Sequence, residues 1–415
     1  MNRRYGMVLI QNDNGPVGGQ RMIMEPTPGW TGSDRKEASA LSGITVAVVG
    51  LGFGQDFVPI YLSHPEVERV VLVEPDQARR RDVAGRYGLG DAYDDIGRAL
   101  ADDSVDAVHI LTPVFTHADL AVAALSAGKH VACAVPMATT LDDLDRIITA
   151  QRGSARQYMM METAVFSREY RFIHRLHRAG DFGALTLYRG VHIQNLDGFP
   201  TYWQGFPPMH YLTHALSPLL ALLDTPVATV TARGAGTLTR DRGAGGFDNP
   251  YPTEVGLFSL RDSDVLADIT IALFRTARSH IEGFALYGDR LGVEWPADNE
   301  GPLTLHEMAG PPPGGRGNQV TVRQVEPVDE LEPLPEPLHP FVRPSTVRLP
   351  GMPAAVRVGG GHGGSHPFLV NEFVRSVVDG RPSLIDARTA ARWTAPGICA
   401  HQSALVGGEV SVPGY

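Results

Sequence analysis

The sequence predicts an α/β domain with a parallel sheet, followed by an α+β domain built on a largely antiparallel open sheet. Apolar β-branched runs alternate with helical segments from residue 44 to about residue 164, which is typical of strand–helix–strand units. From 184 to 295, strand-like runs instead follow one another with short turn signals between them. The length of 415 residues also exceeds one domain of about 100–200 residues. We therefore expect two domains, over residues 44–164 and 165–415.

The composition indicates a globular protein whose partner is a small molecule. Hydrophobic residues make up 43% and charged residues 20% of the chain, and the net charge of −10 argues against nucleic acid or an anionic membrane as the partner. No apolar stretch approaches the roughly 20 residues of a membrane helix, and the N-terminus lacks the apolar core of a secretory signal. Cys133 and Cys399 are too few for a disulfide framework and fit a reducing compartment. We expect a cytoplasmic protein with no membrane or nucleic-acid partner.

Residues 1–43 are a poor start for a domain, because glycine, proline and polar residues surround short apolar pieces. They form either a disordered tail or an arm that is ordered against a partner subunit. The sequence favours neither alternative.

A glycine-rich turn follows the first predicted strand, Thr45–Val49. Gly50, Gly52 and Gly54, with Phe53 among them, permit a tight turn and let the backbone approach a pyrophosphate at a helix N-terminus. The third glycine of G-x-G-x-x-G is absent, since a glutamine follows Gly54. The turn nevertheless predicts a dinucleotide site, because it lies in a strand–helix–strand unit.

The second predicted strand, Val70–Val73, ends at Glu74. This carboxylate could accept hydrogen bonds from an adenosine ribose and would repel a 2′-phosphate, which favours NAD over NADP. Three arginines at 79–81 form either a solvated helix face or a contact to a phosphate. We expect a Rossmann domain that binds NAD, with NADP as the weaker ligand.

Two further segments complete the predicted cofactor pocket. The third strand, Ala107–Leu111, opens into a threonine and a proline, and the segment from 127 to 136 ends in a valine and a proline. A helix at 119–125 lies between them and ends near Gly128. The residues that we expect to border the cofactor here are Thr112, Pro113, His117, Val135 and Pro136.

These segments together resemble the glucose–fructose oxidoreductase/inositol dehydrogenase superfamily, often written Gfo/Idh/MocA. The resemblance extends from about Ile44 through the last helices and excludes the N-terminal arm and the proline-rich segment 296–353. It implies dimers or tetramers formed through the open face of the second domain's sheet. In this superfamily the segment at 127–136 ends Glu-Lys-Pro, and the lysine helps to move the substrate's hydroxyl proton. Here these positions hold Ala134, Val135 and Pro136, which implies a cofactor pocket without the usual catalytic lysine.

The second domain is predicted to begin with a helix at Arg168–Arg178 that Gly180 ends. Residues 296–353 are rich in proline and glycine and are interpreted as a long surface excursion. Helices are expected again at Phe368–Val378 and Ala387–Ala395. The predicted strands are Ala184–Ile193, Val227–Ala232, Val255–Leu260, Val265–Leu273, Ile281–Tyr287 and Leu291–Trp295.

The chemistry is expected in the segment from 210 to 218. Residues four apart share one face of a helix, so His210 and His214 could point into one cleft, with Tyr211 beside them. By the resemblance, His214 matches the usual catalytic histidine, while His210 replaces an aspartate. A histidine pair at this spacing can bind zinc, but the glutamate of H-E-x-x-H is missing. Ser217 lacks the strand–elbow setting of a nucleophile. We expect three catalytic residues and no metal.

Four residues are candidates for contact with the substrate. Trp203 belongs to an aromatic loop suited to stacking on a sugar face, and His362 belongs to a glycine-rich loop. Glu162 is either an acid near the nicotinamide or a surface carboxylate at a strand end. His192 is an alternative for the proton path. The aromatic loop and the glycine loop also have purely structural interpretations, as packing and as a chain turn.

Without a lysine at position 135, Tyr211 and His214 are the candidates to move the proton when an alcohol is oxidised. The leading prediction is an NAD-dependent oxidoreductase acting on a sugar, cyclitol or sugar-containing metabolite. A second is a redox-neutral lyase, dehydratase or glycosidase with tightly held NAD, because α-N-acetylgalactosaminidases of this superfamily also have the valine and a similar Tyr-Pro-Thr-His segment. A third is a non-catalytic nucleotide-binding regulator, against which Tyr211 and His214 count.

Overall fold

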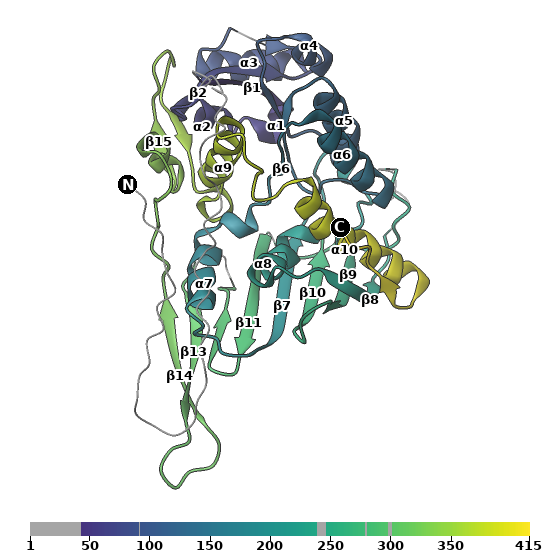
Figure 1. Ribbon diagram of the computed structural model, residues 1–415, viewed down its shortest axis with the longest axis vertical. Coiled ribbons are helices and arrows are strands. Elements are labelled where there is room, and N and C mark those ends of the chain that lie inside the picture. Colours follow the sequence, from purple (N-terminus) through teal and green to yellow (C-terminus); the bar gives the residue numbers. More distant parts are fainter. Residues whose placement is uncertain (1–42, 91, 239–245, 279, 298–300) are drawn as a thin grey trace, which may run out of the picture. The chain divides into compact units, whose positions relative to one another are not determined.

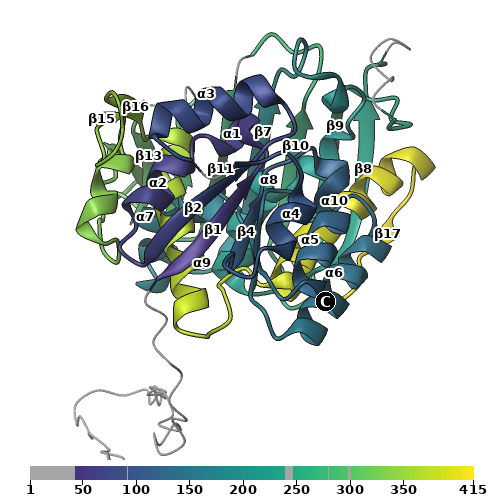
Figure 2. The same ribbon diagram turned by 90° about the horizontal axis from the view of Figure 1, so that it is seen from above.

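The computed structural model describes residues 43–90, 92–238, 246–278, 280–297 and 301–415 (Figures 1 and 2). Residues 1–42, which hold nearly all of the predicted arm or tail, lie outside this part of the chain. The described residues build two large β-sheets, with helices packed against both.

The first sheet is parallel and has the strand order β3-β2-β1-β4-β5-β6, the doubly wound order of a Rossmann fold. Each neighbouring pair in it runs parallel. All six residues of β1 are buried, as expected for a central strand covered on both faces. The prediction of an N-terminal Rossmann domain is confirmed. The strands are β1 Ile44–Val49, β2 Val67–Val73, β3 Ala92–Tyr93, β4 Ala107–Ile110, β5 His130–Cys133 and β6 Tyr158–Met160.

The helices of this domain follow its strands. The carboxylate of Asp76 caps α3 by accepting hydrogen bonds from the backbone N–H groups of Ala78 and Arg79. After α5, the buried Lys129 donates from Nζ to the backbone carbonyls of Asp102 and Val105, both at 2.8 Å. These bonds fasten the start of β5 to the loop before β4. The helices are α1 Leu51–Gly54, α2 Val58–Ser63, α3 Gln77–Tyr87, α4 Ile96–Ala101, α5 His117–Ser126 and α6 Leu141–Ser154.

The second sheet has nine strands in the order β14-β13-β12-β11-β7-β10-β9-β8-β17. Strands β7 and β10 run parallel, and its other neighbouring strands pair antiparallel. This confirms the predicted largely antiparallel sheet. Its strands are β7 Leu185–Gln194, β8 Val227–Ala235, β9 Thr253–Leu260, β10 Leu266–Ala272, β11 His280–Gly288, β12 Leu291–Glu294, β13 Leu303–Gly310, β14 Gln319–Val325 and β17 Val410–Ser411.

The segment 296–353, interpreted from the sequence as a long surface excursion, contains strands that were not predicted. Strands β13 and β14 form an antiparallel hairpin that extends the second sheet at its edge (Figure 1). The prolines and glycines of 311–315 belong to the turn between these strands. The rest of the segment contains the 3₁₀ helix η5, Glu336–Phe341, and the strand β15, Ser345–Val347, which pairs with β16, Val356–Val358.

Helices of the second domain lie between the two sheets (Figure 1). Helix α8, Thr213–Leu223, packs on β7, β10 and β11, while α10, Ala387–Val406, contacts both β8 and the first domain's α6. The helices α7, Arg168–Arg178, and α9, His366–Val378, complete this layer. The first sheet therefore faces the helix-covered side of the second sheet. The site lies between them. In the described part of the chain, no helix is both long and apolar enough to cross a membrane.

Candidate active site

The glycine-rich turn has the geometry of a nucleotide-binding turn. Gly50 has a φ of +90°, and a Cβ atom there would lie 2.7 Å from the carbonyl oxygen of Leu111. At Gly52 a Cβ would meet nothing within 4 Å, so the backbone faces open space. At Gly54 it would lie 3.0 Å from Cγ1 of Val48, so α1 sits tightly on the sheet. Gly54 thus provides the close helix–strand packing that the third glycine usually provides.

Glu74 is buried at the carboxyl end of β2, beside this turn. Its Oε2 accepts a hydrogen bond from the backbone N–H of Leu51 at 2.9 Å, and its Oε1 accepts one from Asp76 at 3.1 Å. The guanidinium of Arg79 lies 3.3 Å from Oε2. The carboxylate is therefore held next to the glycine turn, where a ribose would lie, with one arginine in reach.

A cavity of about 470 Å³ extends from the glycine turn to the second domain. It brings together residues predicted from both domains. From the first domain it is lined by Gly52, Phe53, Thr112, His117 and Val135, and from the second by Trp203, Tyr211, His214 and His362. Its lining contains no lysine or arginine among the described residues.

His117 holds two of the predicted cofactor segments together. Its Nδ1 lies 2.8 Å from the carbonyl oxygen of Pro136, and its Nε2 lies 3.0 Å from that of Thr112. Thr112 also shares a hydrogen bond with Thr116, at 2.6 Å between their Oγ1 atoms. His117 therefore fixes the loops after β4 and β5, in addition to bordering the cavity.

His214, which lines this cavity, forms a buried pair with Glu162. Nδ1 of His214 lies 2.8 Å from Oε1 of Glu162, whose side chain is 0% exposed. Nε2 of His214 makes no hydrogen bond within the described part of the chain. Burial alone would lower the pKa of His214, but the charges of Glu162 and Glu282 and the hydrogen bond to Glu162 raise it to about 9. The pair has the arrangement of a general acid–base group with an orienting carboxylate.

Tyr211 lies against this histidine. Its ring centroid is 4.8 Å from that of His214 and 4.9 Å from that of His192. Burial raises the pKa of Tyr211, and the charges of Glu282 and Glu162 raise it further. The phenol is thus a neutral hydroxyl beside the buried pair.

The structure does not bring His210 into this site. The 3₁₀ helix η4, Pro208–Tyr211, ends before α8 begins at Thr213, so the expected single helix through both histidines is wrong. Prolines at 207 and 208 start the 3₁₀ turn, which rotates His210 away from His214. The His210 ring instead packs 5.2 Å from that of His401, which is bonded to Glu254 at 2.7 Å.

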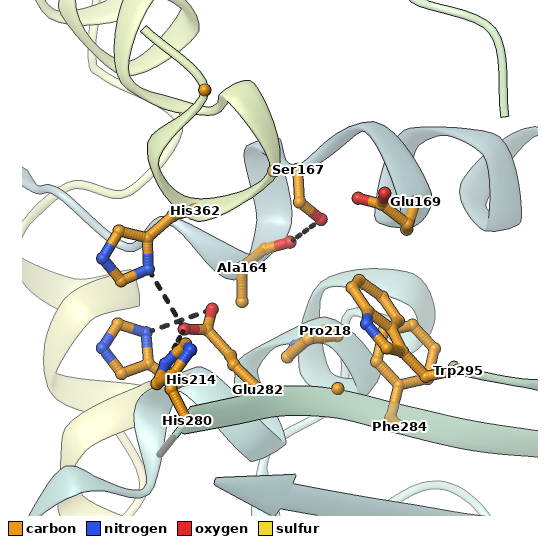
Figure 3. A pocket seen from close by; sticks show the side chains of 13 residues that line it. Ala164, Ser167, Glu169, His214, Pro218, His280, Glu282, Phe284, Trp295 and His362 are labelled. Carbon is orange, nitrogen blue, oxygen red and sulfur yellow. Dashed lines mark hydrogen bonds and ion pairs between the residues drawn. The ribbon is translucent and has the colours of Figure 1, made fainter. Parts of the chain in front are cut away.

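A second cavity, of about 350 Å³, meets the first at His214 and His362 (Figure 3). Its central group is Glu282, which the sequence analysis missed. Oε2 of Glu282 accepts a hydrogen bond from Nδ1 of His362 at 3.2 Å, and Oε1 lies 3.6 Å from Nδ1 of His214. Burial would raise the pKa of Glu282, but the neighbouring histidines hold it well below its usual range.

The glycine loop places His362 beside this carboxylate. His362 has a left-handed φ of 47° within η6, Gly361–Gly364. Its ring stacks 6.0 Å from that of His214. His280, also missed, lines the same cavity with Trp295 and Phe284. His280 directly precedes the predicted strand Ile281–Tyr287 and lies two residues before Glu282. This spacing was the signal that could have found them, because residues i and i+2 of a strand share a sheet face.

Comparison with known proteins relates the sequence of the first domain and the fold of the chain to oxidoreductases. Residues 44–162 match the model of the Gfo/Idh/MocA oxidoreductase family, NAD-binding Rossmann fold. A 4-carboxy-2-hydroxymuconate-6-semialdehyde dehydrogenase of Sphingobium sp. is 28% identical over 41% of this chain and 56% of its own length. A glycosyl hydrolase family 109 protein of Saccharopolyspora erythraea is 24% identical over 85% of this chain and 79% of its own.

The fold likeness extends over both domains. A solved structure of levoglucosan dehydrogenase with NADH and levoglucosan has a TM-score of 0.70 and 17% identity, covering 89% of this chain and 100% of that one. The matches to the first two curated relatives span about half of those relatives' lengths. Residues 44–162 thus match the NAD-binding Rossmann domain of the Gfo/Idh/MocA oxidoreductase family.

Proposed function

We propose that the protein is an NAD-dependent oxidoreductase that acts on a hydroxyl group of a sugar, cyclitol or sugar-containing metabolite. The observation that carries the proposal is the buried His214–Glu162 pair, with the unpartnered Nε2 of His214 in the cavity that begins at the glycine turn. Solved structures of similar fold include levoglucosan and inositol dehydrogenases, which supports the substrate class.

The cofactor residues fit NAD on physical grounds. The open backbone at Gly52 suits the pyrophosphate, and Glu74 suits the ribose. Phe53, Thr112 and Val135 border the space beyond, where the nicotinamide would lie. Bound NAD supplies the hydride acceptor for oxidation of the alcohol carbon.

His214 is proposed to take the proton of the substrate hydroxyl. In the neutral form of His214, Nδ1–H donates to Glu162, Nε2 carries the lone pair that accepts a proton, and the carboxylate stabilises the resulting imidazolium. Because the pKa of His214 is raised to about 9, this neutral form is the minor one at pH 7, and its share grows as the pH rises toward 9. Tyr211 is proposed to hold the same hydroxyl by a hydrogen bond. No step needs an amine at position 135, where Val135 only packs against the cavity.

A redox-neutral activity is the second candidate. The family 109 glycosyl hydrolase relative matches most of the chain, and position 135 is a valine. In this alternative, NAD stays bound and accepts the hydride only transiently. The test is to wash purified protein extensively, measure the NAD that remains, and follow NADH during turnover. Stoichiometric NADH release supports net oxidation, whereas retained NAD without net NADH supports the alternative.

Kinetics of site variants test the proton-transfer pair. His214→Ala and Tyr211→Phe should each lower turnover by about 10²–10⁴-fold, as expected for a general acid–base group, while NAD binding persists. Glu162→Gln should lower turnover because the amide no longer stabilises the imidazolium. His174→Ala is the matched control, since this α7 histidine stacks on Tyr170 and lines neither cavity. Normal turnover in His214→Ala would show that the proton takes another route.

Cofactor choice is tested separately at Glu74. NAD should bind more tightly than NADP by about 1–3 kcal/mol, because a 2′-phosphate would lie beside a buried carboxylate. Titration of both cofactors measures this difference, and Glu74→Ala should reduce it. Equal or tighter binding of NADP would contradict the prediction and direct attention to Arg79, which lies 3.3 Å from the carboxylate.

A further inference from the structure

Three side chains other than His214, Glu162 and Tyr211 converge on one point of the second sheet. His192 on β7 lies directly opposite Glu282 on β11 in the antiparallel register, and His280 lies two residues before Glu282. Directly opposite residues have Cβ atoms about 4.5–5.5 Å apart, and residues two apart on a strand share a face. The sheet itself therefore places these three side chains on one side.

Their donor atoms are close enough to share an ion. One donor atom from each of His192, His280 and Glu282 lies within 4.8 Å of the other two. A zinc ion binds histidine nitrogen and carboxylate oxygen at about 2.0–2.2 Å, so modest side-chain rotations would bring all three into contact with it. Catalytic zinc sites use this ligand set, in which two histidines and one glutamate bind the ion and the fourth coordination position stays open.

The state of His192 points to a missing ligand. Its side chain is 1% exposed, and neither ring nitrogen has a hydrogen-bond partner in the described part of the chain. A buried imidazole without partners is costly, because it has lost its hydrogen bonds to water. The ring is stacked 5.1 Å from that of His214 and lies 5.4 Å from that of His280, so it faces the cluster.

The charge around the cluster is also suited to a cation. Glu162 and Glu282 are two carboxylates facing the one imidazole of His214, which lies between them. The described lining of the adjoining cavity contains no lysine or arginine (Figure 3). A dication would neutralise part of the negative charge of these two carboxylates.

We propose that His192, His280 and Glu282 bind a divalent transition-metal ion, best matched by zinc, with its open coordination position toward the cavity of Figure 3. Glycine loop residue His362, bonded to Glu282, lies at the border of that position. The expectation of no metal rested on the pair His210 and His214, which the structure separates, and it did not consider this set.

The ion has a consequence that rests on the proposed function. A substrate hydroxyl bound at the open position would have a lowered pKa, because the cation stabilises the alkoxide. Its proton would then pass to Nε2 of His214. The ion would thereby supply the positive charge that a lysine at position 135 would otherwise place near the hydroxyl.

The test is a metal titration of the full chain without NAD or substrate. Protein stripped with a chelator is titrated with Co²⁺, whose visible absorption reports a four- or five-coordinate site, and Zn²⁺ is then added to displace it. One ion per chain is expected. His192→Ala and Glu282→Gln should each weaken binding at least about 100-fold, more than the loss of an outer hydrogen-bond partner.

The matched control is His306→Ala. This histidine lies 3.6 Å from Glu294 on the same sheet, in a pair without a third ligand, so its loss should leave binding unchanged. Thermal melts without metal show whether each variant folds. If His192→Ala does not fold, the metal affinity of Glu282→Gln decides the test. Absence of saturable binding, a six-coordinate Co²⁺ spectrum in the wild-type chain, or unchanged binding in the folded variants overturns the proposal. Because binding is measured without turnover, this result is independent of whether the protein oxidises an alcohol.

Discussion

His109 shows how a single buried residue makes the free energy of unfolding of the first domain depend on pH. Its ring lies on β4, fully buried against Phe57, with Nδ1 at 3.1 Å from the hydroxyl of Tyr61. Burial lowers the pKa of His109 from 6.5 to about 3. The unfolded chain therefore binds a proton here near pH 6.5, whereas the folded chain stays neutral until about pH 3.

The consequence is a loss of stability as the pH falls through that window. One proton of difference changes the free energy of unfolding by about 1.4 kcal/mol per pH unit, so about 2–3 kcal/mol should be lost between pH 6.5 and 4.5. Denaturant unfolding of the wild type and of His109→Gln measures this. The variant should show a shallower dependence on pH, whatever its stability at pH 7, and parallel curves would contradict the prediction.

Site residues that belong to a local sequence pattern could be predicted. Site residues that depend on contacts between distant segments could not. Gly50, Glu74 and His214 each follow from a local pattern or from the resemblance to a family. The role of Glu282 could not be predicted from the sequence, because its partner His192 is 90 positions away and only the pairing of β11 with β7 brings the two together. His210 was misplaced because two prolines changed the helix type just before it.

At the scale of elements, Gly190 determines how closely α8 approaches the sheet. A Cβ atom at this position of β7 would lie 2.2 Å from the carbonyl oxygen of Ala215 in α8. The hydroxyl of Tyr188, on the same strand, donates to that oxygen at 2.6 Å. The close approach brings His214 on the helix against His192 on the strand.

Gly190→Ala should therefore displace the helix. We expect a cost of about 1–3 kcal/mol from overpacking, together with a fall in turnover because His214 moves relative to the cavity. Gly153→Ala, in α6 with no atom within 4 Å of the added Cβ, is the control and should be close to neutral. Denaturant unfolding and steady-state kinetics on both variants check this. If Gly190→Ala behaves like the control, the helix position does not depend on this glycine.

Most elements could be predicted because their signals are local. The strand at Ile281–Tyr287 and the helix at Arg168–Arg178 lie within one residue of β11 and α7 at both ends. The hairpin β13–β14 was missed because the prolines and glycines of its turn dominate the composition of 296–353. Strand β13 pairs with β12, and β14 pairs with β13, and no local sequence pattern shows these pairings.

At the scale of the whole molecule, one face of the nine-stranded sheet exposes apolar side chains on four of its strands. The register places side chains from β9, β10, β13 and β14 on the face opposite His192 and Glu282. Each of these apolar side chains is at least 39% exposed: Val255, Leu257, Leu266, Met308, Val320 and Val322. They form two groups, one on β9 and β10 and one on β13 and β14, and exposed apolar groups of this kind often mark an interaction surface.

We expect this face to bind a second copy of the chain. Light scattering after size exclusion should give a dimer or tetramer, and Leu257→Lys combined with Val322→Lys should shift it toward the monomer, because the charges would be buried without partners. Leu384→Lys is the control, since Leu384 is 65% exposed after α9 and outside this face. A monomeric wild type would contradict the expectation. Because the cavities lie on the other side of the sheet, association should leave them open.

The burial of Lys129 leaves residues 43–415 without a lysine amine that reagents can reach. Lys36 and Lys129 are the only lysines in the sequence, and the ammonium of Lys129 is buried on the carbonyls of Asp102 and Val105. Amine-reactive reagents therefore find no accessible ε-amine between residues 43 and 415, since the undescribed positions in that range hold no lysine. The amine introduced by Val135→Lys would be the one that such reagents can label in the cleft, and peptide mapping would separate its label from that of Lys36 and of the N-terminal amine.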